Sequence, residues 1–180
     1  GQKRILKNYT WAGVEHFMIF WGFMIITVGS LEHIVLGFVP GFEIFGFLGG
    51  NAQATFLLIL DIVQALVIIA LGMGVLNRTV IPSGKRREVN SIDAVVILGM
   101  IFGLMVSDFG YRASKVALGV QPETWLPISS LWAELFLSNV NASSAAFSAE
   151  FFWWFHVSLI LAFLNYLPYS KHSHVLTVIP

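Results

Sequence analysis

The stretch that decides the fold is Phe151-Phe152-Trp153-Trp154-Phe155-His156, followed by an apolar run and then by Leu167-Pro168-Tyr169-Ser170-Lys171-His172-Ser173-His174. Its apolar length predicts a membrane-spanning helix with one histidine near its start and another after a proline break. His156 and His174 are eighteen residues apart, which is about five turns and about 27 Å on one helix face. This spacing is typical of a helix that serves two cofactors.

The composition of the whole chain agrees with a membrane protein. Of its 180 residues, 57% are hydrophobic and 11% are charged, and the mean hydropathy is +0.79. These values exclude an ordinary soluble globular domain. The sequence contains no cysteine, so these residues hold neither a disulfide nor a cysteine-ligated iron–sulfur cluster.

Four apolar segments are long enough to cross a bilayer. We predict an all-α, up-down four-helix membrane bundle that forms a single domain over residues 1–180, with spans at about 13–38, 54–76, 91–118 and 148–167. A short amphipathic helix within residues 125–137 is expected at the membrane interface. The start at Gly1 and the end at Pro180 lead us to expect a processed chain or a piece of a longer polypeptide.

Basic residues predict the orientation of the spans. Basic residues precede the first span, lie between the second and third, and follow the fourth: Lys3, Arg4, Lys7, Arg78, Lys85, Arg86, Arg87 and Lys171. The other two connections between spans carry no basic residue. The positive-inside rule therefore places both termini on the cytoplasmic side of an inner membrane.

Four histidines match in depth across the first and last spans. His16 and His174 fall on the cytoplasmic side, and His33 and His156 on the outer side, about 25 Å further along each helix. Two imidazoles per iron suit a haem that transfers electrons and has no open position for oxygen. We therefore expect two haem b groups between the first and last spans, with glycines such as Gly13, Gly22, Gly29 and Gly37 letting the macrocycles approach the backbone.

Other interpretations remain for the individual histidines. A lone histidine in a membrane helix often binds a carbonyl or lines a cavity, and four at matched depths make this less probable. His172 competes with His174 as a ligand because Pro168 interrupts the helix between them and His156.

The segment from His156 to His174, with Pro168-Tyr169-Ser170-Lys171 before the second histidine, resembles the last span of the cytochrome b (gamma) subunit of respiratory nitrate reductase. The resemblance extends to membrane subunits of heterodisulfide-reductase-like complexes and of electron-transferring-flavoprotein:quinone iron–sulfur oxidoreductases. It implies a dihaem b, quinone-linked subunit and haem-ligand roles for His156, His174 and His16. It departs at the second ligand of the first span, where that pattern falls on Ile26, and depth matching selects His33 instead.

Polar residues inside the spans are candidates for a quinone site or for haem propionates. Asp61, Gln64, Asp108 and Glu32 are the quinone candidates. Arg112 and Lys115 are the propionate candidates, since cations on the outer side need a partner of opposite charge. Asp108 and Arg112 are also four residues apart on one helix face, so they can simply pair with each other.

The sequence thus predicts a membrane electron-transfer subunit between the quinone or menaquinone pool and a cytoplasmic iron–sulfur partner, which is either a separate protein or a domain after Pro180. Two alternatives remain open. One is a membrane protein without redox function, in which Asp61, Asp108 and Arg112 line a proton or solute path. The other is a membrane anchor that holds a single haem.

Overall fold

The computed structural model describes residues 10–80, 92–121 and 125–166, and within these it is entirely helical apart from turns and connections. The helices are α2 (Thr10–Leu36), α3 (Gly50–Val80), α4 (Ile92–Ala117), α5 (Pro127–Leu137) and α6 (Ala142–Tyr166), with a short 3-10 helix η1 (Gly46–Leu48) before α3. Four of these helices are long and apolar enough to cross a membrane: Phe17–Leu36, Gly50–Leu76, Val95–Ala117 and Ala142–Tyr166. The predicted number and order of the spans are confirmed.

The predicted bounds differ most at α6, which begins at Ala142 and not at residue 148. The reason is a cap: the side-chain Oδ1 of Asn141 accepts a hydrogen bond from Ser144 N at 2.8 Å. The polar Ser143 and Ser144 therefore belong to the first turn of the helix. The other long helices start or stop within about four residues of the predicted positions, a usual error for helix ends.

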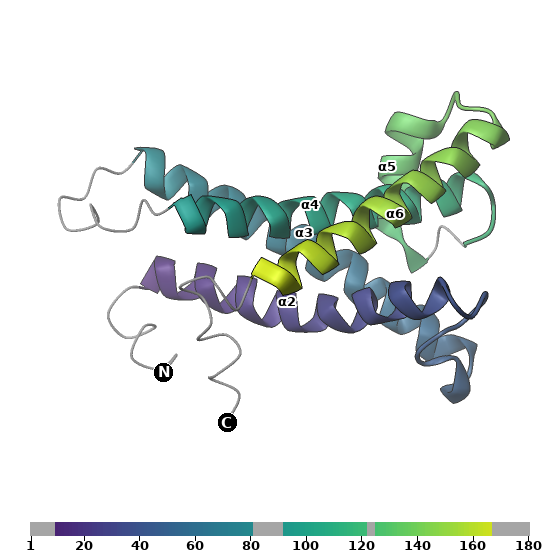
Figure 1. Ribbon diagram of the computed structural model, residues 1–180, viewed down its shortest axis with the longest axis horizontal. Helices are drawn as coiled ribbons and strands as arrows, with labels where there is room; N and C mark the ends of the chain where they lie inside the picture. Colours follow the sequence, from purple (N-terminus) through teal and green to yellow (C-terminus); the bar gives the residue numbers. More distant parts are fainter. Residues whose placement is uncertain (1–9, 81–91, 122–124, 167–180) are drawn as a thin grey trace.

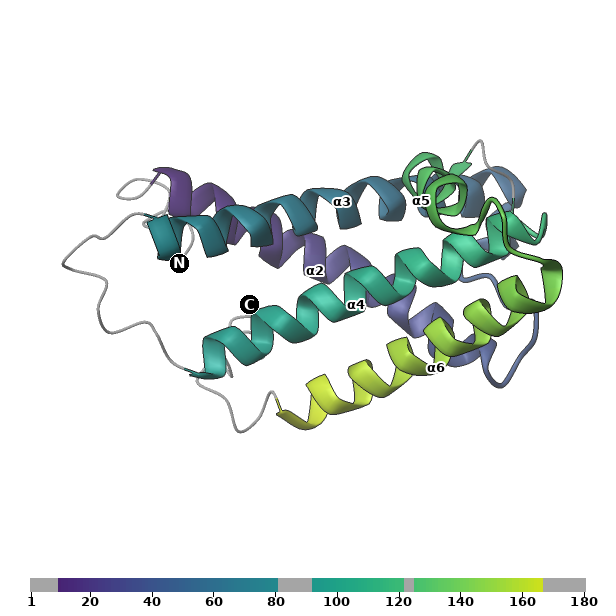
Figure 2. The ribbon, with the colours of Figure 1, turned by 90° about the horizontal axis from the view of Figure 1, so that it is seen from above.

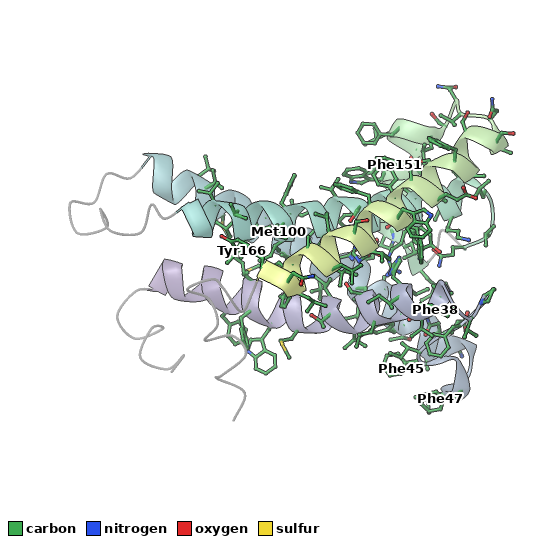
Figure 3. The ribbon with its side chains drawn as sticks, viewed as in Figure 1. Phe38, Phe45, Phe47, Met100, Phe151 and Tyr166 are labelled. Carbon is green, nitrogen blue, oxygen red and sulfur yellow. The ribbon has the colours of Figure 1, made fainter. Side chains whose placement is uncertain are left out.

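Successive long helices run in alternating directions, as an up-down bundle requires (Figure 1). The most extensive contacts join α4 to α6, α2 to α3 and α4 to α5, whereas α2 and α6 touch only lightly. Figure 2 shows α5 at one end of the bundle, and we call this the α5 end. The connection between α2 and α3 lies there too, and carries Phe38, Phe45 and Phe47 (Figure 3).

The distribution of polar and apolar side chains is that of a protein surrounded by lipid. Large apolar side chains point outward along the spans, among them Ile69, Trp154 and Leu161, whose exposed fractions are 56%, 64% and 54%. Polar side chains such as Gln64 and Asp108 are buried between the helices. Since a bilayer core offers no hydrogen-bond partner, this arrangement is expected of a multi-pass membrane protein. The basic residues that orient it lie outside the residues whose side chains are described, so its orientation stays a prediction.

Glycines bring the helices close together, but not where we expected. A Cβ atom at Gly22 would overlap Val67 Cγ2, and one at Gly29 would lie 2.8 Å from Leu60 Cδ1, both on α3. These two glycines therefore serve the packing of α2 against α3, and the expectation that they make room for a macrocycle is wrong. At the interface of α4 with α6, Gly110 faces Phe152 in the same way.

We predict that Gly110→Ala destabilises the bundle, because its Cβ would lie 2.6 Å from ring atoms of Phe152. Overpacking of this kind costs about 1–3 kcal/mol. Gly99→Ala on the same helix is the matched control: its Cβ would meet nothing within 4 Å. Gly99→Ala should therefore stabilise the protein by about 0.8–1.0 kcal/mol, which is the cost of a glycine relative to an alanine inside a helix. Thermal unfolding in detergent should separate the two variants in opposite directions. Equal stability of both variants would contradict the close packing of α4 on α6.

Candidate functional site

The central feature of the interior is the meeting of His33 from α2 with His156 from α6. Their ring centroids are 4.9 Å apart, with an angle of 45° between the ring planes. Both side chains are buried, with residue exposures of 3% and 1%. Two helices that otherwise touch lightly thus bring two imidazoles together inside the bundle, as the matched depths in the sequence predicted.

Hydrogen bonds to Nδ1 orient both rings. His33 Nδ1 lies 3.2 Å from the carbonyl oxygen of Gly29, one turn earlier in α2. His156 Nδ1 lies 3.1 Å from the carbonyl oxygen of Leu104 and 2.8 Å from Ser107 Oγ, both on α4. A carbonyl accepts only, so the proton of each neutral ring is on Nδ1 and the lone pair is on Nε2. Metal-binding histidines are commonly oriented in this way.

The two Nε2 atoms have different neighbours. His156 Nε2 is 3.2 Å from Ser30 Oγ on α2, which can donate to it. His33 Nε2 is 3.2 Å from Asp108 Oδ1, but the two atoms are not aligned for a hydrogen bond, and neither has a hydrogen-bond partner among the described residues. A buried nitrogen with a free lone pair is the kind of atom that a metal ion satisfies.

Asp108 joins three helices around the histidines. Its Oδ2 accepts hydrogen bonds from Arg112 Nε, at 2.8 Å, and from Gln64 Nε2 on α3. The side chains of Asp108 and Arg112 are 3% and 4% exposed. The pairing of Asp108 with Arg112 on one face of α4 is confirmed. The other propionate candidate, Lys115, lies over the ring of Tyr111, with Nζ 5.7 Å from the ring centroid.

The donor set of this site fits a metal. Ligand atoms of His33, His156 and Asp108 all lie within 4.8 Å of one another. Two imidazole nitrogens on opposite sides of one metal ion are about 4 Å apart, since each bond is about 2 Å long. The two histidines, which have their Nδ1 atoms engaged, could therefore hold a metal ion or a metal-containing cofactor through Nε2.

Beside the histidines, Glu32 forms a second polar contact at the α5 end. Gln53 Nε2 donates to Glu32 Oε1 at 2.7 Å, and Gln53 Oε1 accepts from Phe45 N at 3.1 Å. Glu32 Oε2 is buried and has no hydrogen-bond partner among the described residues. The neighbouring residue His33 is also held through its backbone, because Trp153 Nε1 on α6 donates to its carbonyl oxygen at 3.1 Å. Glu32 is thus a quinone candidate with a free acceptor atom, as are Gln64 and Asp108, whose Oε1 and Oδ1 atoms also lack a hydrogen-bond partner among the described residues.

Asp61, in contrast, is fully engaged with the start of α5. Its carboxylate accepts hydrogen bonds from Ile128 N at 2.7 Å, Ser129 N at 3.2 Å and Ser129 Oγ at 2.5 Å. The N-cap position of α5 is Leu126, whose side chain has no capping atom, so a carboxylate from α3 takes this role. The structure therefore gives Asp61 a structural role, and its contact with a quinone stays a prediction.

The second predicted pair of histidines lies outside the described residues. His172 and His174 fall within residues 167–180, and the side chain of His16 is not described although α2 includes this residue. The sequence marks Ser107 as a polar residue inside the third span, next to Asp108. Sequence reasoning missed Ser30, Gln53 and Trp153, because only the three-dimensional contacts identify a role for them.

We predict that Asp61→Ala loosens α5, because it removes the acceptor for two backbone amides at the helix start. Loss of a cap costs about 0.5–2 kcal/mol. Hydrogen exchange at Ile128 and Ser129 should become faster, while exchange in the middle of α4 should not change. Glu134→Gln, which alters an exposed carboxyl of α5 itself, is the control and should leave this exchange unchanged. Unaltered protection of the two amides in Asp61→Ala would contradict the capping role.

Comparison with known proteins gives one informative similarity. No family model matches the chain, and no solved structure matches it. A protein of Bacillus subtilis (strain 168), described as the probable iron–sulfur-binding oxidoreductase FadF, is 30% identical to it over 177 residues. The aligned region covers 98% of this chain and 24% of that protein, so the chain spans about a quarter of the length of this relative. The chain is therefore similar to a segment of an iron–sulfur oxidoreductase.

Proposed function

We propose that this chain is a dihaem b membrane subunit or domain that carries electrons between an iron–sulfur oxidoreductase and the quinone pool. The observation that supports it most is the meeting of His33 and His156 inside a bundle of apolar spans, with both Nδ1 atoms directed at backbone carbonyls. When bound, haem supplies reversible one-electron oxidation and reduction. The protein residues orient the ligands and exclude water from the site.

The ligand assignment divides into two pairs. His33 and His156 are proposed as the axial ligands of one haem, since both are buried and both have Nδ1 held by a backbone carbonyl, while only the hydroxyl of Ser30 contacts His156 Nε2. His16 and His174 are proposed for the second haem, with His172 as the alternative to His174. Both propionate candidates have a partner within the protein, which for Arg112 is Asp108 and for Lys115 is the ring of Tyr111.

The partner is proposed from the relative. FadF is described as iron–sulfur-binding, and this chain of 180 residues contains no cysteine. Cysteine-ligated clusters that exchange electrons with the haems would then lie in another domain or another subunit. In the predicted orientation, the basic cytoplasmic segments would face this partner.

The quinone is proposed at the α5 end, beside Glu32. The free Oε2 atom can accept a hydrogen bond from a quinol hydroxyl, and Gln53 holds the other oxygen at 2.7 Å. Glu32 directly precedes His33, which keeps the distance to the first haem short. Asp61 is less available, because both of its oxygens accept hydrogen bonds at the start of α5. Gln64 and Asp108 bind each other and are more deeply buried, with 1% and 2% exposed against 8% for Glu32.

One observation favours a second candidate function. The buried group of Gln64, Asp108 and Arg112 is a polar cluster within the spans, and such clusters also occur on proton paths. A membrane protein without haem and with a proton path is therefore the alternative. A membrane anchor with a single haem is an intermediate case that uses only one histidine pair.

Haem stoichiometry tests the proposal. The visible spectrum and the pyridine haemochrome assay of the purified chain should give two b haems per chain. His33→Ala and His156→Ala should each lose the same haem, because one iron loses one of its two axial ligands, and the double variant should lose no further haem. Asn165→Ala, at an exposed side chain of α6, is the control and should retain both. Haem-free protein that is folded and was supplied with haem would refute the proposal and favour the proton path.

We further predict that Glu32→Gln slows quinol oxidation at least tenfold, while haem content is retained. Glutamine keeps the size of the side chain but replaces one of the two acceptor oxygens with a donor. Glu150→Gln is the control, as Glu150 is an exposed carboxyl on α6. Reduction of the haems by a soluble quinol analogue, followed by stopped-flow absorbance, measures the effect. Equal rates in both variants would place the quinone away from Glu32.

A further inference from the structure

We propose that Asp108 and Arg112 are positioning residues that set the reduction potential of the group held between α2 and α6, with opposite effects. Asp108 lowers this potential, and Arg112 raises it. The inference rests on the proposed function, in which His33 and His156 are the axial ligands of one haem.

The first step concerns position. Asp108 Oδ1 lies 3.2 Å from His33 Nε2, and a carboxylate oxygen of Asp108 lies within 4.8 Å of a ring nitrogen of each histidine. Arg112 binds the other carboxylate oxygen, Oδ2, through Nε at 2.8 Å. The negative charge therefore lies directly at the histidine pair, and the positive charge lies behind it, on the far oxygen of the carboxylate.

The second step concerns how strongly these charges act. Both side chains are almost completely buried between the helices, with 3% and 4% exposed, so water has little access to them. Coulomb interactions are much stronger in such an interior than in water, and dissolved salt screens them little. Gln64 adds a second donor to Asp108 Oδ2, so the carboxylate is held in place from α3 as well as from its own helix.

The third step gives the sign. The oxidised form of an iron centre carries one more positive charge than the reduced form. A nearby carboxylate stabilises the oxidised form and lowers the potential, whereas a nearby guanidinium does the reverse. Asp108→Asn removes the anion and leaves the positive charge of Arg112 without the carboxylate that it binds, so both changes raise the potential. Arg112→Gln leaves Asp108 unpaired, and the potential falls.

A purely structural role predicts something else. Substitution of either Asp108 or Arg112 breaks the same buried ion pair, so both variants would be less stable than the native protein. A looser, wetter site would also move the potential in one common direction. Opposite shifts from the two variants are therefore specific to a charge effect.

The experiment is a spectroscopic redox titration of the full chain with both haems bound. The variants are Asp108→Asn, Arg112→Gln and the double variant, and the control is Glu150→Gln on the exposed surface of α6. We expect the midpoint potential of one haem to rise in the first variant, to fall in the second, and to return toward the native value in the double variant. The same haem should be the one lost in His33→Ala. The other haem and the control should not shift.

Several results would overturn the inference. These are no shift, shifts of equal sign, or shifts confined to the haem that survives His33→Ala. Asp108→Glu and Arg112→Lys keep their charges, so their potentials should stay closer to the native value than those of the neutral variants. If Asp108→Asn yields no folded protein, as judged by size-exclusion chromatography in detergent, the fall predicted for Arg112→Gln decides the question. Absence of haem from the native chain would instead refute the proposed function, and haem assays show this before any titration.

Discussion

The carboxylate of Asp108 is the point on which the interior of the bundle depends. It lies in an apolar environment where every polar group needs a partner from the protein, because lipid offers none. Gln64 and Arg112 supply donors to one oxygen, and His33 lies 3.2 Å from the other. One side chain thus fixes the relative positions of α2, α3 and α4 near the histidines. The few polar residues of these spans are concentrated in such contacts, while large apolar side chains face outward.

The second constraint is the orientation of the histidine rings. An imidazole in a bilayer core could satisfy both nitrogens with backbone carbonyls or hydroxyls, and it would then be a purely structural residue. Here the carbonyls of Gly29 and Leu104 hold the Nδ1 atoms, whereas His33 Nε2 faces Asp108 on α4 without a hydrogen bond and His156 Nε2 lies 3.2 Å from Ser30 Oγ on α2. The limited contact between these two helices fits this arrangement, since close packing of α2 on α6 would leave no place for a ligand between them.

The sequence predicted the parts of this arrangement that follow from length and depth. Apolar runs of about twenty residues or more identify spans, because the bilayer sets their length. Since residues advance along a helix by a constant rise, the sequence placed His33 and His156 at the same depth, and the structure brings their rings to 4.9 Å between centroids. Asp61 shows what this reasoning cannot reach, as its role depends on the start of α5, which lies 67 residues further along the chain. The prediction that Gly22 and Gly29 make room for a macrocycle was wrong for a related reason. The spacing of small residues shows that they share a helix face, but it does not show that α3 covers that face.

The position of the histidine pair has a consequence for electron transfer. His33 is three residues before the end of α2, which is about 4.5 Å along the helix axis. A redox group at this site therefore lies close to the α5 end, and one such group alone leaves most of the thickness of a bilayer uncrossed. Under the proposed function, electrons reach the opposite side only through a second carrier about 25 Å away along α2, which is the depth of His16. The off-centre place of the first pair is thus a physical reason to expect a second.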